Sequence, residues 1–248
     1  MTFVNSNGVR IYYEAIGQGT PLVLHHATAG SGADYIDLGF VDALQNDHRL
    51  ILIDSRGHGK SDKPHDPDAY NLSSRALDVV AVLNELAVSR TDYYGYSLGG
   101  WIGFGLAKFS ADKFNSFMLG GVHSYAENVQ NIRDLMQNQD PFVTFIAQLS
   151  DMPKTMRSRH IANDLTALRI LTQDRESNAD ALLSMTMPCM LFAGELDPRL
   201  GQVKECAERL PRANFFMLQG CGHTAAIFRS DLIIPHVKSF LRENGLRR

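Results

Sequence analysis

The stretch at residues 92–100, DYYGYSLGG, places one serine among three glycines, where strand-forming residues give way to helix-forming ones. Residues 95–99 match G-x-S-x-G, in which the glycines leave room for a sharp strand-to-helix turn that exposes the serine hydroxyl. Chance supplies such a pentapeptide in roughly one chain in ten. The pattern alone therefore does not distinguish a plain turn from a nucleophile, and the surrounding sequence has to do so.

Short apolar runs recur on both sides of this stretch, with helical patterns between them. Continuous runs of this length favour parallel strands that are buried on both faces. We predict strands at 10–16, 22–24, 50–53, 92–96, 117–119, 189–193 and 215–218, and helices at 74–86, 101–108, 202–210 and 232–244. Ser73 or Ser74 is expected to cap the first helix, and Gly245 to end the last. This alternation predicts an α/β fold with a mostly parallel sheet and helices on both faces.

The alternation is interrupted between about residues 124 and 187. That segment has helical patterns, clearest at 128–139 and 164–172, but no convincing buried strand. We therefore predict a short helical lid at 124–187, inserted after the sixth strand, on a core formed by residues 1–123 and 188–248. The apolar side chains of the lid, including Phe142 and Phe145, are candidates to line a pocket, although packing alone also explains them.

Two residues near the carboxyl ends of predicted strands complement the serine. A serine hydroxyl needs a base to become a good nucleophile, and the base needs an orienting acid. Asp197 follows the run at 189–193 and His223 follows the run at 215–218. Ligands bind at such strand ends in open α/β sheets. The order Ser97, Asp197, His223 therefore predicts a catalytic triad, with Glu195 as the alternative acid.

Composition and charge limit the possible partners and cofactors. A net charge of −3 gives no reason to expect binding to nucleic acid or to an anionic membrane. The three cysteines, 189, 206 and 221, form no C-x-x-C motif and indicate neither a zinc site nor a disulfide framework. The chain shows no apolar run of about 18 residues and no signal-peptide pattern. We expect a cytoplasmic protein that acts on a small molecule without a metal or other cofactor; its oligomeric state is not indicated.

With these residues in place, the chain resembles the α/β-hydrolase superfamily over nearly its whole length. Residues 54–61, DSRGHGKS, are similar to the family's D-x-R-G-x-G-x-S loop, which implies a structural role for Asp54 and Arg56. The resemblance also implies an oxyanion hole made by the backbone N–H groups of Ala27 and Leu98. The fit of the motifs thus extends well beyond the serine.

Two histidines are candidates for the pocket wall. His26 stands where relatives commonly have glycine, so it either points away and binds backbone or lines the pocket and contacts a polar group of the substrate. His123 follows the strand at 117–119 and could face the site from that strand end. Trp101, four residues after the serine, is expected to pack in the core.

A serine at the elbow implies acyl transfer, whereas the similar haloalkane dehalogenases and epoxide hydrolases attack with an aspartate. The resemblance implies a serine hydrolase that cleaves a carboxylic ester or lactone of a small to medium substrate through an acyl-enzyme. C–C bond hydrolysis, haloperoxidase-like perhydrolysis and hydroxynitrile lyase chemistry can use the same triad. A small-molecule receptor that retains the triad is the alternative of another class.

Overall fold

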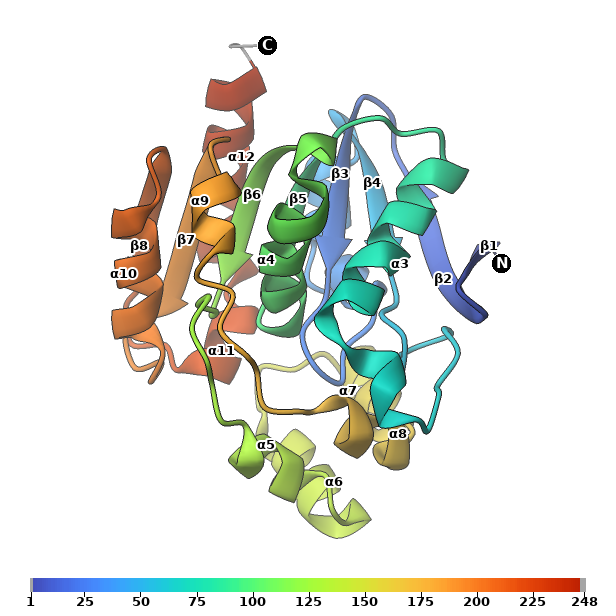
Figure 1. Ribbon diagram of the computed structural model, residues 1–248. Helices are drawn as coiled ribbons and strands as arrows, with labels where there is room; N and C mark the ends of the chain where they lie inside the picture. Colours follow the sequence, from blue (N-terminus) through green and yellow to red (C-terminus); the bar gives the residue numbers. More distant parts are fainter. Residues whose placement is uncertain (1, 246–248) are drawn as a thin grey trace.

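An eight-stranded sheet runs through the computed structural model, which describes residues 2–245 (Figure 1). The strand order is β1-β2-β4-β3-β5-β6-β7-β8. The β1–β2 and β2–β4 pairs are antiparallel, and the other neighbouring strands pair in parallel. The bounds are β1 Thr2–Ser6, β2 Val9–Ile16, β3 Thr20–His25, β4 His48–Ile53, β5 Thr91–Tyr96, β6 Phe114–Gly120, β7 Cys189–Gly194 and β8 Ala213–Leu218. The predicted mostly parallel α/β sheet is confirmed; β1 was not predicted.

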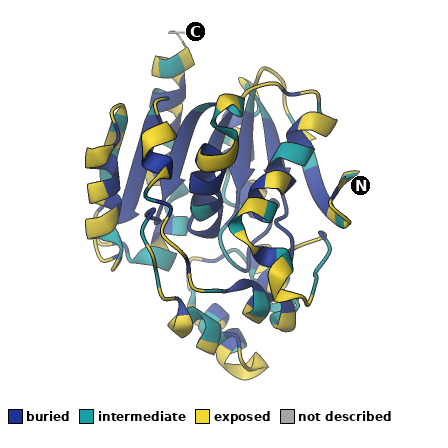
Figure 2. Cartoon of the chain, viewed as in Figure 1, coloured by how far each residue is buried: buried dark blue, intermediate teal, exposed yellow. Residues whose placement is uncertain are grey.

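Helices cover both faces of the sheet and bury its apolar side chains (Figure 2). On one face lie α3 (Leu72–Glu85), α4 (Leu98–Ser110) and α10 (Leu200–Arg209), and α9 (Ala181–Ser184) packs beside α4. On the other face lie α1 (Asp34–Asp37), α2 (Phe40–Leu44), α11 (His223–Ile227) and α12 (Ser230–Gly245). Short 3₁₀ turns, η1 and η2, occupy Pro67–Tyr70 and Ala111–Lys113. Throughout residues 2–245, each helix is too short or too polar to span a bilayer.

The predicted N-cap of the helix at 74–86 was wrong. The helix α3 starts at Leu72, and its N-cap is Asn71, whose side-chain oxygen accepts a hydrogen bond from the Ser74 N–H at 2.8 Å. Asparagine caps a helix as well as serine does, so the sequence allowed either choice. For the last helix, α12 reaches Gly245, the last described residue, so the helix end predicted there stays a prediction.

The segment between β6 and β7 is helical, with α5 (Gln130–Leu135), α6 (Gln139–Gln148), α7 (Lys154–Ile161) and α8 (Leu165–Leu171). The predicted helix at 128–139 is therefore interrupted after Leu135. These four helices lie beyond the end of the sheet toward which the parallel strands point (Figure 1). Their apolar side chains, which include Met136, Phe142, Ile146, Met156 and Leu168, form one cluster together with Ala29 and Tyr70 of the core. This position faces the strand ends that carry the candidate triad.

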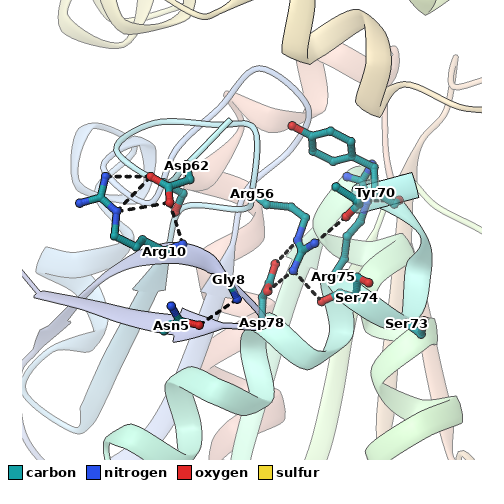
Figure 3. A network of polar contacts seen from close by, with 12 residues as sticks. Asn5, Gly8, Arg10, Arg56, Asp62, Tyr70, Ser73, Ser74, Arg75 and Asp78 are labelled. Atoms are coloured by element: carbon teal, nitrogen blue, oxygen red, sulfur yellow. Dashed lines mark hydrogen bonds and ion pairs between the residues drawn. The ribbon is translucent and has the colours of Figure 1, made fainter. Parts of the chain in front are cut away.

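The loop DSRGHGKS after β4 is held by buried charges. The Arg56 guanidinium binds both carboxylate oxygens of Asp78 on α3, at 2.7 and 2.6 Å (Figure 3). The Asp54 carboxylate accepts hydrogen bonds from the backbone N–H groups of Gly32 and Lys60, at 2.7 and 2.8 Å. The bidentate pair of Arg56 and Asp78 fixes the geometry of both side chains as well as balancing their charges. Both residues thus order backbone around the β4 strand end.

Candidate active site

Ser97 occupies the turn between β5 and α4 in an unusual backbone conformation. Its φ and ψ are 52° and −104°, a region that non-glycine residues rarely adopt. Its N–H donates to the carbonyl oxygen of Gly120 at 2.8 Å, which fixes the turn against β6. A Cβ on Gly95 would lie 2.5 Å from the backbone of Gly99, so the turn requires a residue without a side chain there. Such strain persists only where the surroundings hold it, and it is common at active sites.

His223 lies within hydrogen-bond distance of both other predicted triad residues. His223 Nε2 is 3.0 Å from Ser97 Oγ, and His223 Nδ1 is 2.7 Å from Asp197 Oδ2. Asp197 follows the end of β7, and His223 begins α11 after β8. The parallel strands β5, β7 and β8 thus bring together residues that lie up to 126 positions apart in the chain.

The environment of Asp197 favours a charged carboxylate that faces the histidine. Burial alone would raise the pKa of Asp197, but the hydrogen bonds from His223 and from the Arg199 N–H hold it below its ordinary value. Glu195, the alternative acid, accepts instead from the N–H of Gly220 at 2.8 Å. Of the two carboxylates, only Asp197 contacts His223 among the described residues.

Two backbone N–H groups are available beside Ser97. Among the described residues, neither the Ala27 nor the Leu98 N–H donates a hydrogen bond. Leu98 is the first residue of α4, where the helix dipole adds positive potential, and Ala27 borders the same cavity as Ser97. Free N–H groups at this position are suited to stabilise the oxyanion of a tetrahedral intermediate.

Comparison with known proteins identifies the family of this chain. Residues 20–168 match the sequence model of the α/β-hydrolase fold family. The chain belongs to this family. It is 24% identical to a putative 2-succinyl-6-hydroxy-2,4-cyclohexadiene-1-carboxylate synthase of Bacillus subtilis (strain 168), across 95% of this chain and 96% of that one. It is 26% identical to 3-oxoadipate enol-lactonase 1 of Acinetobacter baylyi (strain ATCC 33305 / BD413 / ADP1), across 64% of this chain and 65% of that one.

A solved structure gives the same fold. The enol-lactonase from Burkholderia xenovorans LB400 superimposes with a TM-score of 0.84, covering 97% of this chain and 100% of that chain at 21% sequence identity. At this level of identity, the likeness concerns the fold. The match of residues 20–168 to the family model confirms the sequence-based assignment to the α/β-hydrolases.

The ring of His26 in this hydrolase is bound on both sides by backbone. Its Nδ1 lies 2.7 Å from the carbonyl oxygen of Ala27, and its Nε2 accepts from the Ser55 N–H at 3.0 Å. An imidazole that accepts at Nε2 carries its hydrogen on Nδ1, so both nitrogens are used. Of the two interpretations of His26, the geometry matches the one in which it binds backbone. It borders the cavity without offering a free polar atom.

A cavity of about 170 Å³ adjoins Ser97 and His223. Its wall is mainly apolar, and helix α6 contributes Phe142 and Phe145 to it, as the sequence suggested. Sequence reasoning missed a polar pair on the wall, in which His160 Nε2 of α7 lies 2.9 Å from Asp34 Oδ2 of α1. The partners are 126 residues apart, so no local pattern could have revealed them.

His123 lies outside the residues that border this cavity, which corrects its placement on the pocket wall. The chain turns after β6 at Gly121, whose φ is 60°, and then runs toward α10. There the backbone N–H of Ser124 contacts the Cys206 sulfur at 3.4 Å, and the His123 ring packs 5.8 Å from that of Tyr125. A residue that follows a strand end therefore does not always face the site.

Within residues 2–245, no cluster of His, Cys, Asp and Glu side chains has the arrangement of a metal site.

Three buried histidines around this site predict a loss of stability in acid. Burial lowers the pKa of His25, His26 and His58 in the folded state, so the unfolded chain binds more protons below its ordinary histidine pKa of about 6.5. The free energy of unfolding should be constant above that pH and fall below it. Each histidine should contribute about 1.4 kcal/mol per pH unit until its folded-state pKa is reached. Urea unfolding between pH 8 and pH 5 measures this dependence.

His58→Gln should reduce the slope by one histidine. A free energy of unfolding that is equal at pH 7 and pH 5 would contradict the burial argument.

Proposed function

We propose that this hydrolase cleaves a carboxylic ester or lactone of a small to medium substrate through an acyl-enzyme. The observation that carries the proposal is the continuous hydrogen-bonded chain Ser97–His223–Asp197 beside the unpaired N–H groups of Ala27 and Leu98. The names of relatives that act on lactones support the same bond class. Each of these five residues then has a distinct task in the reaction.

The reaction proceeds in two acyl-transfer steps. Ser97 Oγ attacks the substrate carbonyl carbon while His223 Nε2 takes its proton, and Asp197 stabilises the imidazolium and fixes its orientation. The N–H groups of Ala27 and Leu98 bind the resulting oxyanion, a contribution of about 3 kcal/mol for one such donor. The leaving alcohol takes the proton from His223. Water then attacks the acyl-enzyme with His223 as base, and Ser97 is released.

The cavity indicates the size and polarity of the substrate. A volume of about 170 Å³ with an apolar wall suits a short, uncharged acyl group. We assign residues 124–187 the role of the predicted lid. In support, Ile132 of α5, Phe142 of α6, Met156 of α7 and Met152 between α6 and α7 line the cavity. His160, held by Asp34, is the polar group that a hydroxyl or carbonyl of the substrate would meet there.

A panel of p-nitrophenyl esters and lactones tests the proposal. We expect multiple turnovers, with kcat/KM highest for short acyl chains and at least about 10-fold lower for dodecanoate, because a single methylene that does not fit already costs a factor of this order. A receptor that retains the triad would release at most one equivalent of p-nitrophenol per chain. Turnover of C–C bond, perhydrolysis or cyanohydrin substrates, without turnover of any ester or lactone, would contradict the proposed bond class.

A further inference from the structure

The two ends of the helical segment between β6 and β7 are fastened to each other. The N–H of Glu127 donates to the carbonyl oxygen of Arg175 at 3.0 Å, and the N–H of Arg175 donates to the carbonyl oxygen of Glu127 at 2.8 Å. Their side chains form an ion pair as well, with Arg175 Nη1 3.0 Å from Glu127 Oε2. The chain that holds α5–α8 is therefore closed at its base by backbone and by charge.

The second carboxylate oxygen of Glu127 connects this base to the candidate acid. Glu127 Oε1 lies 2.5 Å from Arg199 Nε, in an ion pair whose N–H is not aligned with the oxygen. Arg199 follows Asp197 by two residues; its backbone N–H donates to Asp197 Oδ1 at 3.0 Å, and its Nη1 lies 3.9 Å from the same oxygen. Asp197 Oδ1 is thus held by Arg199, while Oδ2 faces His223.

Charges of alternating sign therefore run from the base of the helical segment to the triad, in the order Arg175, Glu127, Arg199, Asp197. The first three side chains are only 7%, 14% and 11% exposed, so the solvent screens them weakly. Burial lowers the pKa of Arg175 to about 10, which still leaves it charged at neutral pH. In such surroundings, removing one charge leaves its neighbour unbalanced.

The same series contacts the nucleophile's helix. The Arg175 guanidinium lies 5.5 Å from the ring centre of Trp101, on the first turn of α4. The N–H of Trp101 donates to the carbonyl oxygen of Ser97 at 2.9 Å. Arg175 thus touches the element that carries Ser97 as well as the chain of charges that ends at Asp197.

We propose that Arg199, Glu127 and Arg175 form a charged strut of positioning residues, which holds Asp197 in place and sets the charge balance around His223. The inference rests on the proposed function, since it assigns the strut to that triad. It ties the triad to the base of α5–α8, so the position of these helices and the charge at the catalytic acid are coupled.

Apart from the strut, several other titratable side chains lie close to the triad. Tyr96 of β5 packs 5.5 Å from the His223 ring, and burial keeps the pKa of Tyr96 well above its ordinary value. His123, after β6, interacts with Glu127 and Arg199, and burial lowers its pKa. Cys221 precedes His223 and is a buried free thiol. Other ionisable side chains nearby are Glu195, which accepts from the Gly220 N–H at 2.8 Å, Arg229, whose Nη1 lies 4.0 Å from the Cys221 sulfur, and Asp34 on the cavity wall. The variants of the strut leave these three residues unchanged, so a difference between the variants reports the strut.

The test compares variants of opposite charge through the pH dependence of kcat/KM. Glu127→Gln removes an anion, which makes the imidazolium of His223 less favourable. The acidic limb of the kcat/KM profile should therefore move to lower pH. Arg199→Gln removes a cation but keeps the backbone N–H on Asp197, and should move the limb to higher pH. We expect each shift to be about half a pH unit, less than the one to three units of a directly contacting charge. Arg199→Lys restores the charge and should return the limb toward the wild-type position.

A merely structural role would lower activity in both variants without moving the limb in opposite directions, and that result would overturn the strut. Glu243→Gln, an exposed change on α12, serves as the control and should not move the limb. If Glu127→Gln does not fold, the Arg199→Gln and Arg199→Lys pair carries the test alone. An unmoved limb in an enzyme that Ser97→Ala inactivates refutes the strut but leaves the proposed function standing; retained turnover in Ser97→Ala overturns both.

Discussion

Ser97→Ala should lower kcat on the best ester by about 10⁴-fold or more, while the protein stays folded. The expected size follows from other hydrolases with a serine triad, in which loss of the nucleophile removes nearly all the catalysis that the triad provides. Alanine keeps the Cβ and the strained backbone at φ 52°, so the free energy of unfolding should change by less than about 0.5 kcal/mol. Steady-state kinetics and urea unfolding measure the two quantities independently.

The proposed acyl-enzyme gives a direct readout for the same variant. Wild-type protein quenched during turnover of a slow ester should carry one acyl group on the peptide that contains Ser97, and Ser97→Ala should carry none. Ser239→Ala, on the surface of α12, should match the wild type in both assays. Full turnover by Ser97→Ala, or an acyl group on another residue, would contradict the assigned nucleophile.

The parallel part of the sheet was predictable because each strand leaves a local signal. Runs such as Leu50–Ile53 are apolar throughout, as is typical of strands buried on both faces, and they appear within β4 and its neighbours. The edge strand β1 leaves a weaker signal, since most of its residues are exposed or half-buried. The turn that joins it to β2, Asn7-Gly8, has φ values of 51° and 86° and is a strong hairpin signal. That dipeptide could have revealed β1.

The candidate triad was predictable for a topological reason. Parallel strands end at the same edge of the sheet, so a serine, an aspartate and a histidine that each follow a strand are brought together without knowledge of the loops. The strut and the His160–Asp34 pair lacked such a rule, because their partners come from the helical segment between β6 and β7. How that segment folds back on the sheet depends on packing, and its sequence has no period that fixes the contact. The prediction for His123 was wrong because the turn at Gly121, just after β6, directs the chain away from the site.

Gly99→Ala should cost about 4 kcal/mol or more of unfolding free energy and abolish most turnover. A Cβ on Gly99 would lie 2.2 Å from the carbonyl oxygen of His25 and 3.0 Å from that of His26, both at the end of β3. Backbone atoms cannot rotate away as a side chain does, so α4 and β3 would have to separate, at the severe end of overpacking costs. That separation would stretch the bond from the Gly99 N–H to His26, now 3.1 Å, and displace Ala27 from Ser97. Urea unfolding and kcat on the best ester measure both effects.

Gly201→Ala is the matched control, because no atom lies within 4 Å of the added Cβ and the residue sits near the start of α10. That change should raise the free energy of unfolding by about 0.5–1 kcal/mol, because alanine lowers the conformational entropy of the unfolded chain. The activity should stay unchanged. The two substitutions add the same methyl group to a helix, so their difference isolates the close approach at the elbow. Stability of Gly99→Ala within about 1 kcal/mol of the wild type would show that β3 and α4 can separate at little cost. The glycine at 99 would then be a feature of the turn that neither the fold nor the candidate oxyanion hole requires.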